Sequence, residues 1–124
     1  MKKVMIFGTF DILHKGHLNF FEQAKKYGDY LILVVARDKT VKKIKGRLPM
    51  NNEKKRLETV RKYADKTVLG CIKDRYNVIR KFKPDLICLG YDQEASLKDL
   101  KKFEISIKRL RAYEPHKYKS SKLS

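Results

Sequence analysis

The sequence has little of what marks secreted, membrane-spanning or metal-binding chains. Its 124 residues include two cysteines, three prolines and no tryptophan, and no apolar run approaches the roughly 20 residues of a membrane span. The basic start, Met1-Lys-Lys, is followed by an apolar stretch that Asp11 interrupts, so we expect no signal peptide and a cytoplasmic protein without a membrane partner. Cys71 and Cys88 form no CxxC pair, which excludes a zinc pattern, and we expect no metal held by the protein alone.

Acidic residues are also scarce. Lys and Arg number 31 against 14 for Asp and Glu, which gives a formal net charge of +17. A surface this basic attracts nucleic acid through its phosphates. However, the chain has no RNP, zinc-finger or helix-turn-helix pattern, and many lysines lie on expected outer helix faces. We therefore expect only non-specific nucleic-acid binding, and a dedicated nucleic-acid-binding protein remains the alternative from another functional class.

Strand-like and helix-like patterns alternate along the chain, which favours an α/β fold. The apolar runs Val4–Phe7 and Tyr30–Ala36 are typical of parallel strands buried on both faces. We predict strands at 4–7, 30–36, 66–71, 85–90 and 104–111, and helices at 18–27, 76–82 and 97–102, with a further helix capped by Asn52. The predicted fold class is α/β: a Rossmann-like doubly wound five-stranded parallel sheet with helices on both faces. Ligands of such sheets bind at the carboxyl ends of the strands, beside the first strand.

Three further features complete the expected outline. Gly28 follows the first helix at a plausible C′ position. Residues 39–51 contain Gly46 and Pro49 without clear periodicity, so we predict a long basic loop there. A chain of this length forms a single domain, 1–124, of which 117–124 has the composition of a flexible tail.

The most informative segment is Gly8–His17, a strand-to-helix turn with two glycines and two histidines where the helix begins. The start of a helix presents backbone N–H groups and the positive end of the helix dipole, which favour a bound phosphate. His14 and His17 can add donors aimed at the same anion. This segment therefore predicts a phosphate site.

The segment resembles the G-x-F-D-x-x-H-x-G-H signature of the nucleotidylyltransferase superfamily, the cytidylyltransferase-like group. The matching residues are Gly8, Phe10, Asp11, His14, Gly16 and His17. Asn52–Arg56, Leu89–Gln93 and Lys119–Lys122 follow in the order of the family's later segments. Within the superfamily, the chain is most similar to the archaeal FAD synthases and next to the glycerol-3-phosphate cytidylyltransferases.

The resemblance implies transfer of a nucleoside monophosphate from a nucleoside triphosphate to a small phosphorylated acceptor, with release of pyrophosphate. AMP transfer from ATP to FMN, giving FAD, is the first expectation. CTP-dependent transfer to glycerol-3-phosphate or a similar phospho-alcohol is the alternative. The resemblance also implies Mg²⁺ bound with ATP or CTP, and a homodimer.

The resemblance also assigns roles to individual residues. It implies His14 and His17 on the triphosphate, and Lys45 and Arg56 as further phosphate-binding catalytic groups; Asp11 is equally open to a role in capping the turn. The expected nucleotide-binding residues are Gly8, Thr9, Phe10, Asp11, His14, Lys15, Gly16, His17, Gly90, Asp92, Tyr118, Ser120 and Ser121. The expected acceptor-binding residues are Lys42, Lys45 and Arg47.

Overall fold

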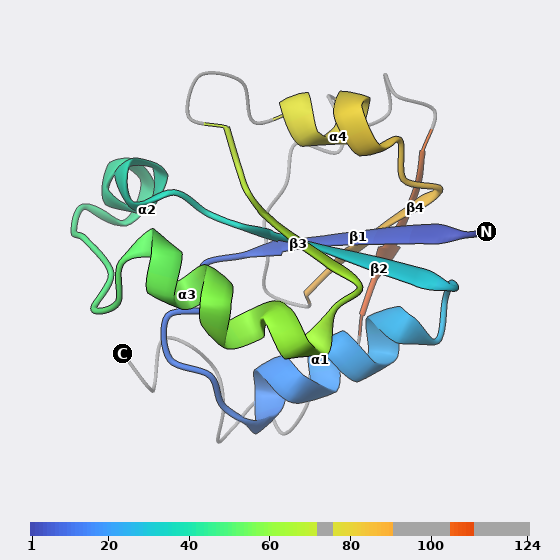
Figure 1. The fold of residues 1–124 in the computed structure, drawn as a ribbon, viewed down its shortest axis with the longest axis horizontal. Coiled ribbons are helices and arrows are strands. Elements are labelled where there is room, and N and C mark those ends of the chain that lie inside the picture. Colours follow the sequence, from blue (N-terminus) through green and yellow to red (C-terminus); the bar gives the residue numbers. More distant parts are fainter. Residues whose placement is uncertain (72–75, 91–104, 111–124) are drawn as a thin grey trace.

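The computed structural model describes residues 1–71, 76–90 and 105–110 (Figure 1). The predicted site residues Asp92, Tyr118, Ser120 and Ser121, the predicted helix at 97–102 and the predicted tail lie outside these residues. Within the described part of the chain, no helix is both long and apolar enough to cross a membrane.

Five parallel strands form one sheet in the order β3-β2-β1-β4-β5. The strands are β1 (Lys3–Gly8), β2 (Tyr30–Val35), β3 (Lys66–Leu69), β4 (Leu86–Leu89) and β5 (Ser106–Arg109). The chain adds strands on one side of β1 up to β3 and then returns to the other side of β1 with β4. In Figure 1 the carboxyl ends of β1 and β2 point to the left, toward α2, and that of β3 points to the upper left. The predicted parallel five-stranded sheet, with the last strand at its edge, is confirmed.

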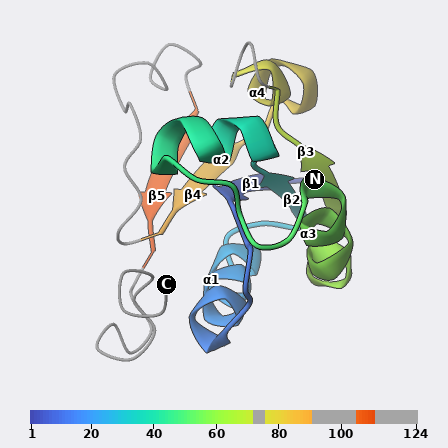
Figure 2. The ribbon, with the colours of Figure 1, turned by 90° about the vertical axis from the view of Figure 1, so that its left-hand side faces the viewer.

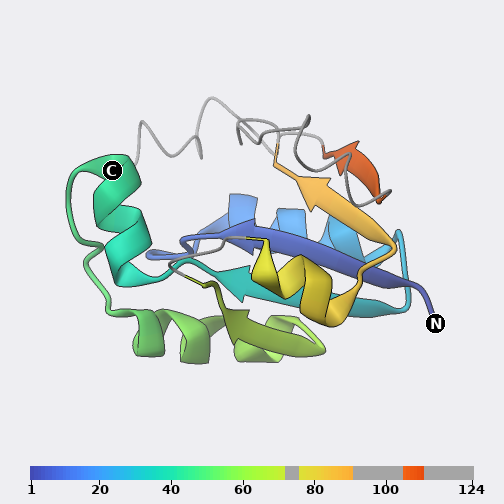
Figure 3. The same ribbon diagram turned by 90° about the horizontal axis from the view of Figure 1, so that it is seen from above.

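Helices cover both faces of the sheet, as predicted. They are α1 (Lys15–Lys25), α2 (Asp38–Lys45), α3 (Glu53–Val60) and α4 (Asn77–Phe82), and a 3₁₀ turn η1 (Arg61–Tyr63) follows α3. Helices α1 and α3 lie on one face and α4 on the other (Figures 1 and 3). Reversal of the strand order after β3 requires this change of face if all crossovers have the same hand. Each face carries its own apolar cluster, centred on Phe21 and Val60 on one side and on Val78 and Ile79 on the other.

The prediction of an irregular loop at residues 39–51 is wrong over its first half, because α2 spans Asp38–Lys45. Only Val41 of this helix is buried, and Ile44, three positions later, is its one other apolar residue, so the helical spacing in the sequence rests on two residues. Charge and capping stabilise it instead: Asp38 stands in the first turn, lysines stand in the last turn, and Gly46 ends the helix in the left-handed conformation with φ of 80°. Helix α2 lies beyond the carboxyl ends of the strands (Figure 2).

Gly28 does not cap α1 as predicted. The C-cap is Lys26, and Gly28 has no positive φ. A Cβ atom on Gly28 would lie 2.6 Å from Val4 Cγ2 and 2.8 Å from the Lys2 carbonyl oxygen. This glycine therefore permits close packing of the turn after α1 against the start of β1.

In the turn after β1, the aromatic ring of Phe10 packs directly over Gly8. Phe10 has a positive φ of 52° and is almost fully buried. Its ring packs edge-on against Phe21 and His17, with ring centroids 5.3 and 5.7 Å apart. A Cβ atom on Gly8 would lie 2.4 Å from Cζ of Phe10. The glycine and the phenylalanine of the motif thus depend on each other, and together they set where α1 begins.

Gly8→Ala is expected to destabilise the protein by about 2 kcal/mol, because the new methyl group must displace a buried ring in a packed core. Gly70→Ala, at the glycine that follows β3, is the matched control, since its Cβ atom would meet nothing closer than 3.6 Å. This control is expected to change the free energy of unfolding by less than about 1 kcal/mol. Urea denaturation of both variants measures the difference, and equal stabilities would contradict the packing described for Gly8.

Candidate functional site

His14 and His17 form a reciprocal cap at the start of α1. Nδ1 of His14 accepts a hydrogen bond from the Gly16 N–H at 3.0 Å, and Nδ1 of His17 accepts one from the His14 N–H at 3.4 Å. An imidazole whose Nδ1 accepts carries its proton on Nε2. Both rings therefore present Nε2–H as their donor. The sequence predicts that backbone N–H groups at the start of this helix favour a phosphate. In the structure the Gly16 N–H is bonded to His14.

Both histidines are neutral near pH 7. Burial lowers the pKa of His14. Burial, followed by the charges of His14 and Lys45, lowers the pKa of His17 to about 4. The rings lie with centroids 4.1 Å apart, so a proton on one disfavours a proton on the other. Lys45, the last residue of α2, therefore acts electrostatically on His17, and its role as a site residue stays a prediction.

Asp11 clamps the motif to the segment before α3. Its carboxylate accepts hydrogen bonds from the N–H groups of Met50 at 2.7 Å and Asn51 at 2.8 Å, and from Nδ2 of Asn51 at 3.1 Å. Burial raises the pKa of Asp11, but the hydrogen bonds from Asn51 and Met50 outweigh it, and the pKa is lowered overall. These bonds run to a segment about 40 positions away instead of capping the turn itself, and the nucleotide-binding role of Asp11 stays a prediction.

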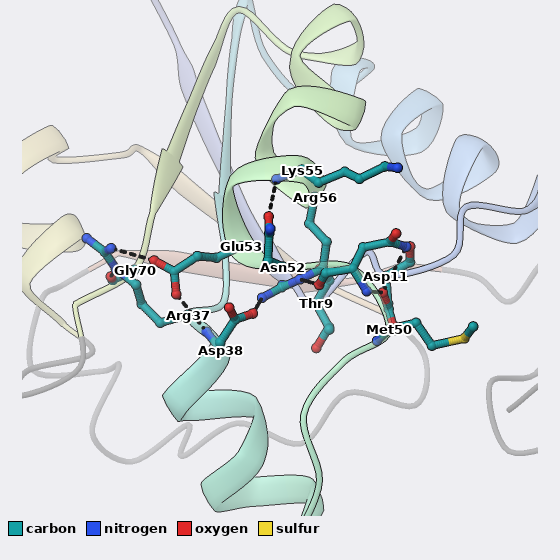
Figure 4. A network of polar contacts seen from close by, with 11 residues as sticks. Thr9, Asp11, Arg37, Asp38, Met50, Asn52, Glu53, Lys55, Arg56 and Gly70 are labelled. Atoms are coloured by element: carbon teal, nitrogen blue, oxygen red, sulfur yellow. Dashed lines mark hydrogen bonds and ion pairs between the residues drawn. The ribbon is translucent and has the colours of Figure 1, made fainter.

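Arg56 is buried and bonded to three separate segments. Its Nε donates to the Asn51 carbonyl at 2.9 Å, Nη1 donates to the Thr9 carbonyl at 2.8 Å, and Nη2 pairs with Oδ1 of Asp38 at 2.7 Å. The side chain is 0% exposed. The guanidinium joins the turn after β1, the start of α2 and the start of α3 (Figure 4). In this arrangement it acts as a positioning group, and direct contact with a phosphate stays a prediction.

A second arginine extends these contacts to β3. Nη1 of Arg37 pairs with Oε2 of Glu53 at 2.8 Å, and its Nε donates to the Gly70 carbonyl at 2.9 Å. Oε1 of Glu53 accepts from the Asp38 N–H at 3.0 Å. The pKa of Glu53 is lowered chiefly by the Asp38 hydrogen bond, against burial, with help from Arg37. We call Asp11, Arg37, Asp38, Asn51, Glu53 and Arg56 the polar network; it joins the carboxyl ends of β1, β2 and β3 (Figure 4).

Other predicted residues within the described part of the chain lie at the start of α1, on and after α2, and after β4. Lys15 is the first residue of α1 and is exposed, and Gly90 follows β4. Lys42 and Arg47 are exposed on α2 and just after it, and their acceptor-binding role stays a prediction. The Phe10 side chain points into the core, so only the backbone of Phe10 could approach a nucleotide. Sequence reasoning missed Arg37, Asp38, Asn51 and Glu53, whose only signal is their place at strand ends and helix starts.

The carboxylates of the site do not form a metal centre. Among residues 1–71, 76–90 and 105–110, no three His, Cys, Asp or Glu side chains gather in one place. Asp11 and Asp38 are committed to backbone N–H groups and to Arg56, respectively.

Comparison with known proteins shows which family the chain resembles. A family model described as cytidylyltransferase-like matches residues 5–121. The chain is 47% identical over 93 residues to an FAD synthase from Ferroglobus placidus, across 75% of this chain and 61% of that protein. It is 44% identical over 103 residues to an FAD synthase from Pyrococcus horikoshii, across 81% and 70%. It is 41% identical over 127 aligned positions to one from Thermococcus sibiricus, across 95% and 83%. The chain thus spans about three fifths of the Ferroglobus protein.

Two solved structures resemble the fold. A crystal structure titled as the lipopolysaccharide core biosynthesis protein from Thermoplasma volcanium matches with a TM-score of 0.85 and 38% identity, over 92% of this chain and 99% of that one. A protein of unknown function from Archaeoglobus fulgidus matches with a TM-score of 0.70 over 90% of each chain. At 23% identity, the second match supports the fold alone.

The low pKa of His17 predicts a specific dependence of stability on pH. Unfolding returns His17 to its ordinary pKa, so between pH 6.5 and about 4 the unfolded state binds the extra proton and the folded state loses stability as the pH falls. Between pH 7 and 4.5 the wild-type protein should lose about 2 kcal/mol more than His17→Gln. Urea denaturation at both pH values measures this, and equal losses would show that His17 titrates normally in the folded protein.

Arg56→Lys is expected to cost about 3 kcal/mol of stability, because an ammonium cannot serve three buried acceptors in different directions. The control is Arg61→Lys, at an exposed ion pair with Glu58 one turn further on, which should cost less than about 1 kcal/mol. Thermal and urea denaturation compare the two. Similar losses in both variants would contradict a special role for the buried guanidinium.

Proposed function

This chain belongs to the cytidylyltransferase-like family, and on that basis we propose that it is a nucleotidylyltransferase that transfers AMP from ATP to FMN. The family membership confirms the resemblance drawn from Gly8–His17. The relatives named FAD synthases, which are 41% to 47% identical, support FMN as the acceptor.

The observation that carries the proposal is the histidine pair at the start of α1. Two neutral imidazoles with Nε2–H donors, fixed by their Nδ1 hydrogen bonds, suit the stabilisation of negative charge on phosphate oxygens. The positive end of α1 and the nearby Lys45 favour the same anion. No nucleophilic side chain paired with a base is needed for this chemistry.

In the proposed reaction, an oxygen of the FMN phosphate attacks the α-phosphorus of ATP. The new P–O bond forms as the bond to the bridging α,β-oxygen breaks, and pyrophosphate leaves with that electron pair. The attacking phosphate is already an anion near pH 7, so the protein need not remove a proton from it. Its task is to hold two mutually repelling anions in line and to stabilise the charge that develops on the leaving group.

His14 and His17 are proposed to donate to the triphosphate, and Lys45 to reach the phosphates from α2. Arg56 and Asp11 are proposed to act by position: they hold the turn after β1, the segment before α3 and the start of α2 in one arrangement. Mg²⁺ is proposed to arrive with ATP as part of the substrate. A site that is assembled before substrate binds loses less free energy to reorganisation during the reaction.

Purified protein with Mg²⁺, ATP and FMN is expected to form FAD and pyrophosphate in equal amounts, measured by chromatography with flavin fluorescence. CTP in place of ATP, and glycerol-3-phosphate in place of FMN, test the alternative pair of substrates. Formation of CDP-glycerol without any FAD would overturn the choice of acceptor while leaving nucleotidyl transfer intact.

His17→Ala is expected to lower kcat by about a hundredfold to a thousandfold, because one preorganised donor to the transition state is lost. Lys54→Ala, an exposed position on α3, is the control and should retain full activity. Circular dichroism checks that both variants fold. A folded His17→Ala protein with wild-type kcat would contradict the assigned role.

A further inference from the structure

Among the described residues, large apolar side chains are exposed at both ends of the strands, and four of the six lie on segments at the carboxyl ends. The six are Met1, Ile12, Tyr27, Ile44, Leu48 and Met50. Met1 and Tyr27 lie near the amino ends of the strands, where the turn after α1 meets the start of β1. Ile12, Ile44, Leu48 and Met50, with exposures of 57%, 75%, 59% and 82%, belong to the turn after β1, to α2 and to the segment that follows α2. We call these four residues the apolar patch.

The apolar patch borders the site already described. Asp11, next to Ile12, binds the backbone N–H of Met50, so the two segments are joined at this point. Ile44 precedes Lys45, whose charge acts on His17. Figure 2 shows α2 and the segment after it in front of the carboxyl ends of the strands. In Figure 4 the Met50 side chain extends away from the polar network.

Core packing does not explain these side chains. Val41 is the only buried residue of α2, and Ile44, three residues later, is left largely in solvent. Exposed apolar side chains grouped beside a polar site are typical of ligand-binding or interaction surfaces. We therefore expect a ligand or a partner to bind the apolar patch.

The surrounding charge restricts what that occupant can be. Lys42, Lys43, Lys45 and Arg47 alternate with the apolar residues along this segment. A second copy of the chain on this face would bring two such basic segments together, which costs free energy through like-charge repulsion. A ligand with a flat apolar body and an anionic group satisfies both features of the surface.

We propose that the apolar patch binds the aromatic ring system of the acceptor, and that the basic residues between its members face the acceptor phosphate. This inference rests on the proposed function, because an aromatic phosphate ester is the acceptor assigned there. It adds a ring-binding surface that selects an aromatic acceptor over a small phospho-alcohol. Contact with an apolar surface removes ring area from water and so contributes to affinity.

The test is the triple variant Ile44→Ser, Leu48→Ser, Met50→Ser. All three side chains are exposed, so folding should be preserved. The KM for FMN is expected to rise about tenfold or more, because apolar contact with the ring is lost, with the KM for ATP and kcat changed by less than about threefold. Riboflavin, which has the ring without the phosphate, should lose affinity to the same extent in a fluorescence-quenching titration.

Two control variants separate ring contact from general damage. Ile44→Leu, Leu48→Met, Met50→Leu keeps the surface apolar and should keep the wild-type KM for FMN. Tyr27→Ser alters an exposed ring at the opposite end of the molecule and should also leave it unchanged. An unchanged KM for FMN in the serine variant overturns the proposal, as does a change from dimer to monomer in sedimentation without a change in flavin affinity.

Measuring FMN binding separately from FAD formation distinguishes failure of the ring-binding surface from failure of the proposed function. If the wild-type protein binds FMN and the serine variant does not, the ring-binding surface stands even where no FAD is formed. If the wild-type protein neither binds FMN nor forms FAD, both proposals fail.

Discussion

The buried guanidinium of Arg56 is the interaction on which the arrangement of the site depends. A sheet edge is a set of strand ends that diverge into loops, and nothing in strand pairing fixes those loops relative to one another. Arg56 bonds to Thr9, Asn51 and Asp38, one from each of three such segments. A buried charge is costly unless it is paired and fully hydrogen bonded, so this geometry tolerates little displacement. The buried guanidinium therefore holds the three segments in one arrangement.

The histidine pair differs from Arg56 because both of its rings are uncharged near pH 7. Burial disfavours protonation of His17, and so do the neighbouring His14 ring and the charge of Lys45. The Nδ1 hydrogen bonds within the cap leave Nε2–H as the donor on each ring. In the proposed reaction, the neutral donors of the two rings orient the substrate phosphates, and the net charge of +17 attracts them. Orientation and charge are thus provided by different residues.

The fold could be predicted from the sequence because apolar runs such as Tyr30–Ala36 and the alternation of elements carry strong local signals. Helix α2 was not predicted, because its eight residues include only two apolar ones, Val41 and Ile44, and of these only Val41 is buried. The histidines were recognisable from one short motif. The burial of Arg56 was not, because arginine is usually exposed and its partners, such as Thr9 at 47 positions away, are distant in sequence.

The central claim is that the site presents two neutral imidazoles whose protons are fixed on Nε2. Nitrogen-15 spectra of the histidine side chains at pH 7 test it most directly, because protonated and unprotonated ring nitrogens have well-separated shifts. The account predicts unprotonated Nδ1 and protonated Nε2 for both His14 and His17. A charged imidazolium, or a proton on Nδ1 of either ring, would contradict it.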